Sequence, residues 1–210
     1  MNEDEIRNAY SEKYPFIQKA SEDLKDDMKA LLEGKIHFDR ITSRAKGIDR
    51  FVIKSQKKKD GYEELKYKDP FKEIQDQIGI RIIVLYLSDV EKVAKIIRDY
   101  YGSFEETKKE PSDDFQFKYF GKHFILQVPS SIRKKYKKIN IPVYFELQIK
   151  TVFQHAWGEC EHDLNYKSMN GTLTHEMKRL IALASAQAWG SDKAFQDIID
   201  KLSINKKEES

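Results

Sequence analysis

Two carboxylates next to predicted β-strands are the side chains of this sequence best suited to chemistry. Asp76 comes directly before the apolar run at 78–87, and Glu146 lies on the polar side of the alternating run at 143–150. Carboxylate oxygens are hard ligands of the kind that Mg²⁺ prefers, above all where the ion also holds nucleotide phosphates. The sequence therefore predicts that Asp76 and Glu146 together bind Mg²⁺.

Positive charge suited to phosphates lies upstream of these carboxylates and between them. The segment 42–58 has the spacing of a helix and carries cations every four residues, with a further arginine nearby: Lys46, Arg50 and Lys54, and Arg44. Cations on one helix face repel each other, so such a row is favourable where a triphosphate neutralises it. Arg81 lies inside the apolar run, where a guanidinium needs an anion. The pattern indicates either a nucleotide-phosphate site or a structural ion pair between Asp76 and Arg81.

Other reactive residues match known sites less well. His155, Glu159 and His162 share one face of the predicted helix at 151–166 and have the spacing of metal ligands, although such histidines more often pack or pair. Cys160 lies on the apolar stripe of the same helix, where we expect it to be buried and unreactive. The sequence contains no GxxxxGK segment and therefore no P-loop, and neither GxSxG nor GxGxxG is present.

The elements that position these residues follow from hydrophobic periodicity and turn residues. The β-branched run at 78–87 is typical of a buried strand, and the alternation at 143–150 is typical of a half-buried one. Further strands are expected at 120–128 and, weakly, near Phe104. Helices are expected at 3–33 with a break near Pro15, and at 42–58, 71–75, 89–101, 151–166 and 173–202, before a frayed tail at 205–210.

This order of elements indicates an α/β (α+β) chain with roughly five strands, and we expect helices to cover one face of the sheet and leave the other for a ligand.

Of the 210 residues 35% are charged and 12% are aromatic, which excludes disorder over most of the chain. No apolar stretch reaches the roughly 18 residues of a membrane span. The N-terminus lacks an apolar signal segment, and a single cysteine excludes an internal disulfide. We expect a cytoplasmic protein without membrane partners.

Two long segments carry three ordered motifs. DPFKEIQDQIGIRIIVLYLSDVEKV contains DxxGIR, and YFELQIKTVFQHAWGECEHDLNYK contains ExQIxT followed by AWxxxEHxLxYK. In these motifs the chain resembles the synthetase domain of RelA/SpoT-type enzymes and is most similar to the single-domain small alarmone synthetases. The resemblance implies a nucleotidyltransferase-like domain at 41–168 with a mixed, mostly antiparallel sheet. N-terminal helices at 1–40 and a C-terminal helix and tail at 169–210 would flank it.

The resemblance also implies a reaction, in which the β,γ-diphosphate of ATP passes to a ribose 3′-hydroxyl. Glu146, Asp76 and Arg81 would be catalytic, with Mg²⁺ on the two carboxylates. The charge pattern and the motifs together place ATP on a basic set: Arg44, Lys46, Arg50, Lys54 and Arg81. The acceptor would contact a second set, in which the ring of Tyr119 stacks on its base: Lys118, Tyr119, Lys122, His123, Gln148 and Lys150.

The sequence departs from the family pattern mainly around the acceptor. The family's G-Y-x-S-x-H segment has lysine for glycine at Lys118 and glycine for serine at Gly121. Arg50 replaces a common serine in the first basic segment. Lys150 replaces the arginine of ExQIRT, which keeps the charge but loses the two-pronged hydrogen bonding of a guanidinium.

Three functions are consistent with these residues. The 3′-CCA end of tRNA is slightly favoured as acceptor, because Lys118, Lys122 and the basic run at 133–138 are suited to an RNA backbone. The resemblance then implies the toxic branch of the family, which blocks translation and is neutralised by an antitoxin. The alternative acceptor is GDP or GTP, giving ppGpp or pppGpp in the stringent response. A third reading is an inactive nucleotide-binding module. The basic run is equally consistent with a solvated loop, and the sequence leaves a homo-oligomer open.

Overall fold

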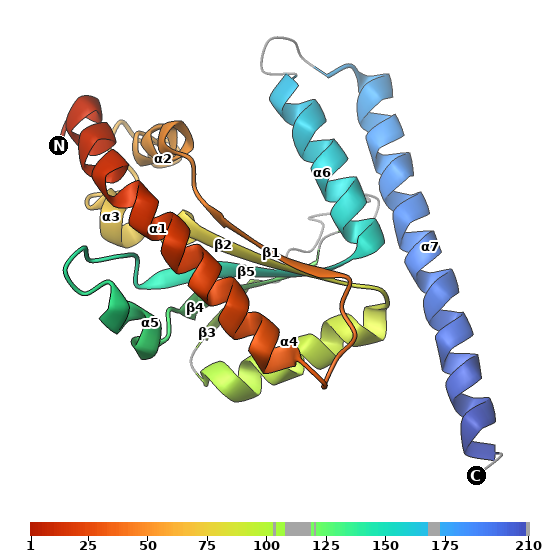
Figure 1. The fold of residues 1–210 in the computed structure, drawn as a ribbon. Coiled ribbons are helices and arrows are strands. Elements are labelled where there is room, and N and C mark those ends of the chain that lie inside the picture. Colours follow the sequence, from red (N-terminus) through yellow and green to blue (C-terminus); the bar gives the residue numbers. More distant parts are fainter. Residues whose placement is uncertain (103, 108–118, 120, 168–172, 209–210) are drawn as a thin grey trace.

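A five-stranded sheet with the order β1-β2-β5-β4-β3 forms the centre of the molecule (Figure 1). The computed structural model describes residues 1–102, 104–107, 119, 121–167 and 173–208. β2 (Ile78–Val84) and β5 (Tyr144–Thr151) run parallel. The other neighbours are antiparallel and involve β1 (Arg40–Ala45), β4 (Lys122–Gln127) and β3 (Phe104–Thr107). The prediction of a mixed, mostly antiparallel sheet is confirmed.

Helices cover one face of this sheet and leave the other open. α1 (Glu3–Leu32), α4 (Leu87–Tyr101) and α5 (Ser130–Lys135) pack against alternate residues of the central strands, all at most 1% exposed: Ile78, Ile80 and Ile82 of β2, and Phe145, Leu147 and Ile149 of β5. Because successive side chains of a strand point to opposite faces, the residues between them project from the open face. That face carries Gly79, Arg81, Glu146 and Gln148.

The remaining helices frame the two ends of the open face. α2 (Ile48–Ser55), α3 (Pro70–Glu73) and the short helix η1 (Gln75–Gln77) precede β2, whereas α6 (Val152–Lys167) follows β5 directly. α7 (His175–Glu208) runs beside α6 and continues past the sheet (Figure 1). Phe153 of α6 stacks on Phe195 of α7 with ring centroids 5.8 Å apart. Among the residues that the structure describes, no helix combines the length and apolarity needed to cross a membrane.

The structure corrects two predictions about the N-terminal third. α1 continues through Pro15 without a break, since Tyr10, Ile17 and Leu24 pack against the core on both sides of the proline and offset the cost of its missing N–H. The helix expected at 42–58 begins only at Ile48, because 40–45 forms the edge strand β1 instead. Pairing with the exposed edge of β2 overrides the helical spacing of the basic residues, so the row of cations does not share one helix face.

Candidate active site

The strand register aligns polar side chains in rows across the open face. One row contains Arg44 of β1, Gly79 of β2 and Glu146 of β5, whose strands are hydrogen-bonded neighbours. The next row contains Thr42, Arg81, Gln148 and His123. A cleft of about 150 Å³ lies over these rows, and its walls include Arg44, Arg81, Glu146 and Glu159. The sheet therefore brings both predicted arginines to the cleft that contains Glu146.

Gly79 lets the side chain of Arg44 lie across β2. A Cβ atom added at Gly79 would stand 3.5 Å from both Cγ and Nε of Arg44. A longer side chain at this position would take the space that the arginine uses. These distances are ordinary van der Waals contacts, so an alanine would fit, whereas a larger side chain at position 79 would compete with Arg44 for the cleft.

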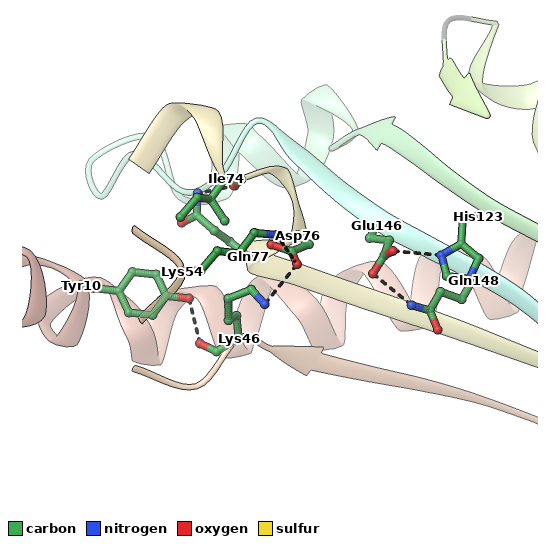
Figure 2. A network of polar contacts seen from close by, with 9 residues as sticks. All are labelled: Tyr10, Lys46, Lys54, Ile74, Asp76, Gln77, His123, Glu146 and Gln148. Carbon is green, nitrogen blue, oxygen red and sulfur yellow. Dashed lines mark hydrogen bonds and ion pairs between the residues drawn. The ribbon is translucent and has the colours of Figure 1, made fainter. Parts of the chain in front are cut away.

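Asp76 is held between two lysines at the start of β2 (Figure 2). Its Oδ2 lies 3.0 Å from Nζ of Lys46 and 2.8 Å from Nζ of Lys54. The backbone at Lys46 is itself fixed, since its carbonyl accepts a hydrogen bond of 2.9 Å from the hydroxyl of Tyr10. Burial lowers the pKa of Lys46, although the neighbouring Asp76 acts to raise it. The two lysines reach one carboxylate from a loop and from α2, which the helical-row prediction did not foresee.

The second oxygen of Asp76 fits the requirements of a metal ligand. Oδ1 is buried and has no hydrogen-bond partner among the residues that the structure describes. A buried acceptor of this kind usually has a hydrogen-bond or metal partner. Carboxylate oxygens are the donors that Mg²⁺ takes up with nucleotide phosphates. The residues present are therefore compatible with the predicted Mg²⁺.

Glu146 is oriented by two side chains from the open face (Figure 2). Nδ1 of His123 lies 3.0 Å from its Oε1, and Nε2 of Gln148 donates a hydrogen bond of 3.0 Å to its Oε2. His123 is 5% exposed, and its Nε2 is buried with no partner in the described part of the chain. A carboxylate held by two neighbours is suited to accept a proton from a hydroxyl placed beside it.

Arg81 is paired with α6 rather than with Asp76. Its guanidinium donates a hydrogen bond of 2.6 Å to Oε1 of Glu159 and one of 3.3 Å to Oε1 of Gln148. Its Nη1 also lies 3.2 Å from Nδ1 of His155. The alternative of an Asp76–Arg81 ion pair is therefore wrong. Burial acts to raise the pKa of Glu159, but the charge and hydrogen bond of Arg81 outweigh it and the pKa is lowered. Burial, followed by the charge of Arg81, lowers the pKa of His155.

The structure therefore gives α6 a different role from the one suggested by its histidines. Within the described residues no three His, Cys, Asp or Glu side chains come together as a metal set. His155 and Glu159 face Arg81, while His162 is exposed. Sequence reasoning considered Glu159 only as a metal ligand, although its helical spacing from His155 placed both on one face. Cys160 is exposed, which corrects the prediction that it is buried.

Two further cations lie at the margins of the cleft. Arg50 is exposed on α2 and lines a neighbouring hollow of about 350 Å³ together with Arg44 and Lys46. Lys150 is 9% exposed and extends under α6, with its Nζ 3.2 Å from the position that a Cβ of Gly158 would occupy. Its charge acts on His155 and Glu159, so it contributes to the positive potential around Arg81.

Gly121 and Lys150, two departures from the family pattern, are in direct contact. A Cβ atom at Gly121 would stand 2.2 Å from the carbonyl oxygen of Ile149 and 2.5 Å from Cγ of Lys150. Both separations are too short for any side chain unless the backbone moves. The glycine is thus required by the close approach of its backbone to β5.

Two described members of the predicted acceptor set, Tyr119 and Lys122, contact groups other than Glu146. Lys118 lies outside the described residues. Lys122 projects from the helix-covered face, with its Nζ 3.0 Å from Glu91 and 3.5 Å from Glu106. The hydroxyl of Tyr119 donates a hydrogen bond of 2.7 Å to Asp192 of α7. Of the acceptor set, the structure brings His123 and Gln148 to Glu146.

The basic run at 133–138 also lies away from the cleft. Its first half belongs to α5, whose Ile132 is part of the core on the helix-covered face. Nζ of Lys135 is 3.2 Å from Asp23 of α1. A strand of RNA that reached Glu146 on the open face would leave these cations on the other side of the sheet.

Comparison with known proteins gives the family. The model described as "Region found in RelA / SpoT proteins" matches residues 43–171. The chain belongs to this family. Among curated proteins it is 25% identical over 164 residues to the GTP pyrophosphokinase YwaC of Bacillus subtilis, covering 73% of this chain and 72% of that protein. It is 23% identical over 169 residues to YjbM, a GTP pyrophosphokinase of the same organism, covering 75% and 70%.

Solved structures of this family share the fold. Small alarmone synthetase 1 from Bacillus subtilis superposes with a TM-score of 0.71 at 20% identity, covering 93% of this chain and 98% of that one. The same synthetase bound to its product pppGpp gives a TM-score of 0.66 at 22% identity, covering 87% and 92%. The predicted synthetase fold is confirmed, with Arg44, Arg81 and Glu146 along one cleft of it.

Proposed function

We propose that this member of the RelA/SpoT family transfers the β,γ-diphosphate of ATP to the 3′-hydroxyl of GDP or GTP. One observation carries the proposal: Glu146, held by His123 and Gln148, lines the same cleft as Arg44 and Arg81. A base for the acceptor hydroxyl and cations for a nucleotide thus lie together in one cleft on the open face of the sheet.

On the donor side, Arg44 and Arg81 flank the nucleotide, and Lys46 and Lys54 lie where a phosphate would compete with Asp76. The lysines each contact Asp76 in this structure, at 3.0 and 2.8 Å, so their charge is already gathered at one point. A phosphate that displaced this carboxylate oxygen would therefore meet both ammonium groups together. Mg²⁺ held by Asp76 and Glu146 would neutralise phosphate charge and polarise the phosphoryl oxygens.

On the acceptor side, Glu146 takes the proton of the 3′-hydroxyl while the oxygen of that hydroxyl attacks the β-phosphorus of ATP. The bond between that phosphorus and the oxygen bridging to the α-phosphate breaks, and AMP leaves. His123 and Gln148 keep the carboxylate in place during this step, since both contact its oxygens. General-base assistance of this kind contributes on the order of 10²–10⁴ in rate.

The choice of GDP or GTP rests on the placement of charge and on the relatives. YwaC and YjbM are GTP pyrophosphokinases, and small alarmone synthetase 1 binds pppGpp as its product. Among the described cations that favoured tRNA, Lys122 lies between Glu91 and Glu106, and those of α5 belong to the helix-covered face. A free nucleotide needs no path for a phosphate backbone beyond the cleft.

The 3′ end of tRNA is the second candidate, because the acceptor segment differs from the family at Lys118 and Gly121. Incubating the protein with ATP labelled in its terminal phosphates, in parallel with GDP, GTP and deacylated tRNA, separates the candidates. We expect label in ppGpp or pppGpp together with equimolar AMP. Label on tRNA alone would refute the nucleotide acceptor and support the toxic branch with its antitoxin partner. No AMP with any acceptor would refute diphosphate transfer.

A further inference from the structure

A buried carboxylate on α7 binds the predicted base-stacking residue. Asp192 is 1% exposed, and its Oδ2 accepts hydrogen bonds from Oγ1 of Thr151 at 2.5 Å and from the hydroxyl of Tyr119 at 2.7 Å. Its Oδ1 is buried without a partner among the described residues. Two hydroxyls therefore share one oxygen of an otherwise unsatisfied group. This arrangement links the C-terminal helix to the acceptor segment.

The bond holds Tyr119 at the far end of β5 from Glu146. Thr151 is the last residue of β5 and follows Glu146 by five positions, or about 17 Å at the usual rise of a strand. The hydroxyls of Tyr119 and Thr151 bind the same oxygen of Asp192, so this bond fixes the tyrosine at the Thr151 end of the strand.

Asp192 itself is fixed from several directions. Four residues further along α7, Oε1 of Gln196 accepts a 2.9 Å hydrogen bond from the backbone N–H of Ser88 at the start of α4. Phe195 stacks on Phe153 of α6, with ring planes 20° apart. The segment of α7 around Asp192 is thus docked against two helices.

We propose that Asp192 is a positioning residue that competes with the acceptor for Tyr119. It withdraws the tyrosine while the cleft is empty and so sets how tightly the acceptor binds. This inference rests on the proposed function, because it takes Tyr119 as the residue that stacks on the acceptor base. A hydrogen bond to a charged group is strong enough to matter in this competition.

The test uses Tyr119→Phe, which keeps the stacking ring and removes the hydroxyl that Asp192 binds. We expect the acceptor KM of this variant to fall roughly tenfold, as for the loss of one charge-assisted competitor, without a matching change in the KM for ATP. Asp192→Asn, which keeps the shape and one acceptor oxygen, should lower the acceptor KM less. The matched control is Tyr136→Phe, which removes a comparable 3.0 Å hydrogen bond to Asp23 on the helix-covered face. An acceptor KM that rises in Tyr119→Phe, or that changes no more than in the control, would overturn the proposal.

Amide hydrogen exchange gives a readout that needs no turnover. Without nucleotide, peptides covering 187–199 should exchange faster in Tyr119→Phe than in the wild-type protein or in Tyr136→Phe. Adding the acceptor, GDP in the first instance, to the wild-type protein should produce the same acceleration. If these peptides do not respond in Tyr119→Phe, the proposal fails even where diphosphate transfer is intact. If they respond but no acceptor yields AMP, the bond exists and the proposed function has failed instead.

Discussion

The donor side and the acceptor side of the cleft are built differently. The proposed donor side takes its charged groups from strands β1 and β2, from the residues next to them and from α2, and two of its lysines meet on Asp76. Its members are Arg44, Lys46, Lys54, Asp76 and Arg81. The acceptor side depends on Tyr119, which α7 holds, and on His123, which Glu146 holds. On the proposed donor side, ion pairs within the protein bring Lys46 and Lys54 together, whereas on the proposed acceptor side a hydrogen bond ties Tyr119 to α7. This contrast indicates that acceptor choice is the adjustable part of the site.

The largest expected effect lies where the two sides meet. Glu146→Gln and Asp76→Asn should each reduce diphosphate transfer at least a hundredfold, since they remove the base for the hydroxyl or a ligand of the metal. Steady-state AMP formation with GDP or GTP checks this. Glu91→Gln, a carboxylate change on α4 outside the cleft, is the control and should stay within a fewfold of wild type, as is usual for surface substitutions. Near-full activity in Glu146→Gln would show that another group takes the proton.

On the donor side, Lys46→Met and Lys54→Met should weaken ATP binding by roughly 1.5–3 kcal/mol each, the cost of a lost hydrogen bond to a charged group. Lys122→Met is the matched control. Its ammonium lies between Glu91 and Glu106 on the helix-covered face, so ATP affinity should not change. Isothermal titration calorimetry with a non-hydrolysable ATP analogue measures the affinity of the two test variants and of the control. Equal losses in all three variants would indicate a general effect of charge rather than direct contacts.

On the acceptor side, Gly121→Ser restores the residue usual in the family but should not restore its behaviour. A Cβ there would meet the carbonyl of Ile149 at 2.2 Å, so we expect a loss of roughly 1–3 kcal/mol in unfolding free energy, as for overpacking. Turnover with GDP or GTP should fall more than ATP affinity. The control is Gly190→Ala on α7, which has open space around it. Denaturant unfolding measures this free energy. If Gly121→Ser and the wild-type protein had the same unfolding free energy, the backbone of Gly121 would not approach β5 closely.

The smallest effect concerns the ion pair between Arg81 and Glu159. The pKa of Glu159 is lowered from its ordinary value of 4.5, so the pair stabilises the folded chain above that pH and the contribution is lost as the pH falls. Because Glu159 is 56% exposed, the stabilisation should be below about 1 kcal/mol. Glu159→Gln should therefore differ from wild type in unfolding free energy at pH 7 and match it at pH 3. A difference that is constant with pH would assign the effect to packing.

Much of the fold was predictable because its signals are local. The apolar run predicted at 78–87 contains β2 at 78–84, and the alternation predicted at 143–150 nearly coincides with β5 at 144–151. That alternation placed Glu146 and Gln148 correctly on one face, and the structure adds Arg81 of β2 to the same face. β1 was missed because Lys46, Arg50 and Lys54 have helical spacing, whereas the strand at 40–45 exists through its pairing with β2. Edge pairing is a long-range interaction, and no periodicity within the segment reports it.

The sequence alone determined the family motifs and the sheet with one covered face, and it predicted the charged groups of the proposed donor side. Only the tertiary structure decided which charges meet. Lys46 and Lys54 share Asp76, Arg81 pairs with Glu159, and Lys122 turns away from the cleft. Asp192 carries no signal in the sequence, because a lone aspartate in a polar helix acquires its role through burial against residues 41 and 73 positions away, Thr151 and Tyr119. The chemistry of each side chain follows from its residue type. Which charges pair depends on strand register and helix docking, because these bring distant parts of the chain within hydrogen-bond distance.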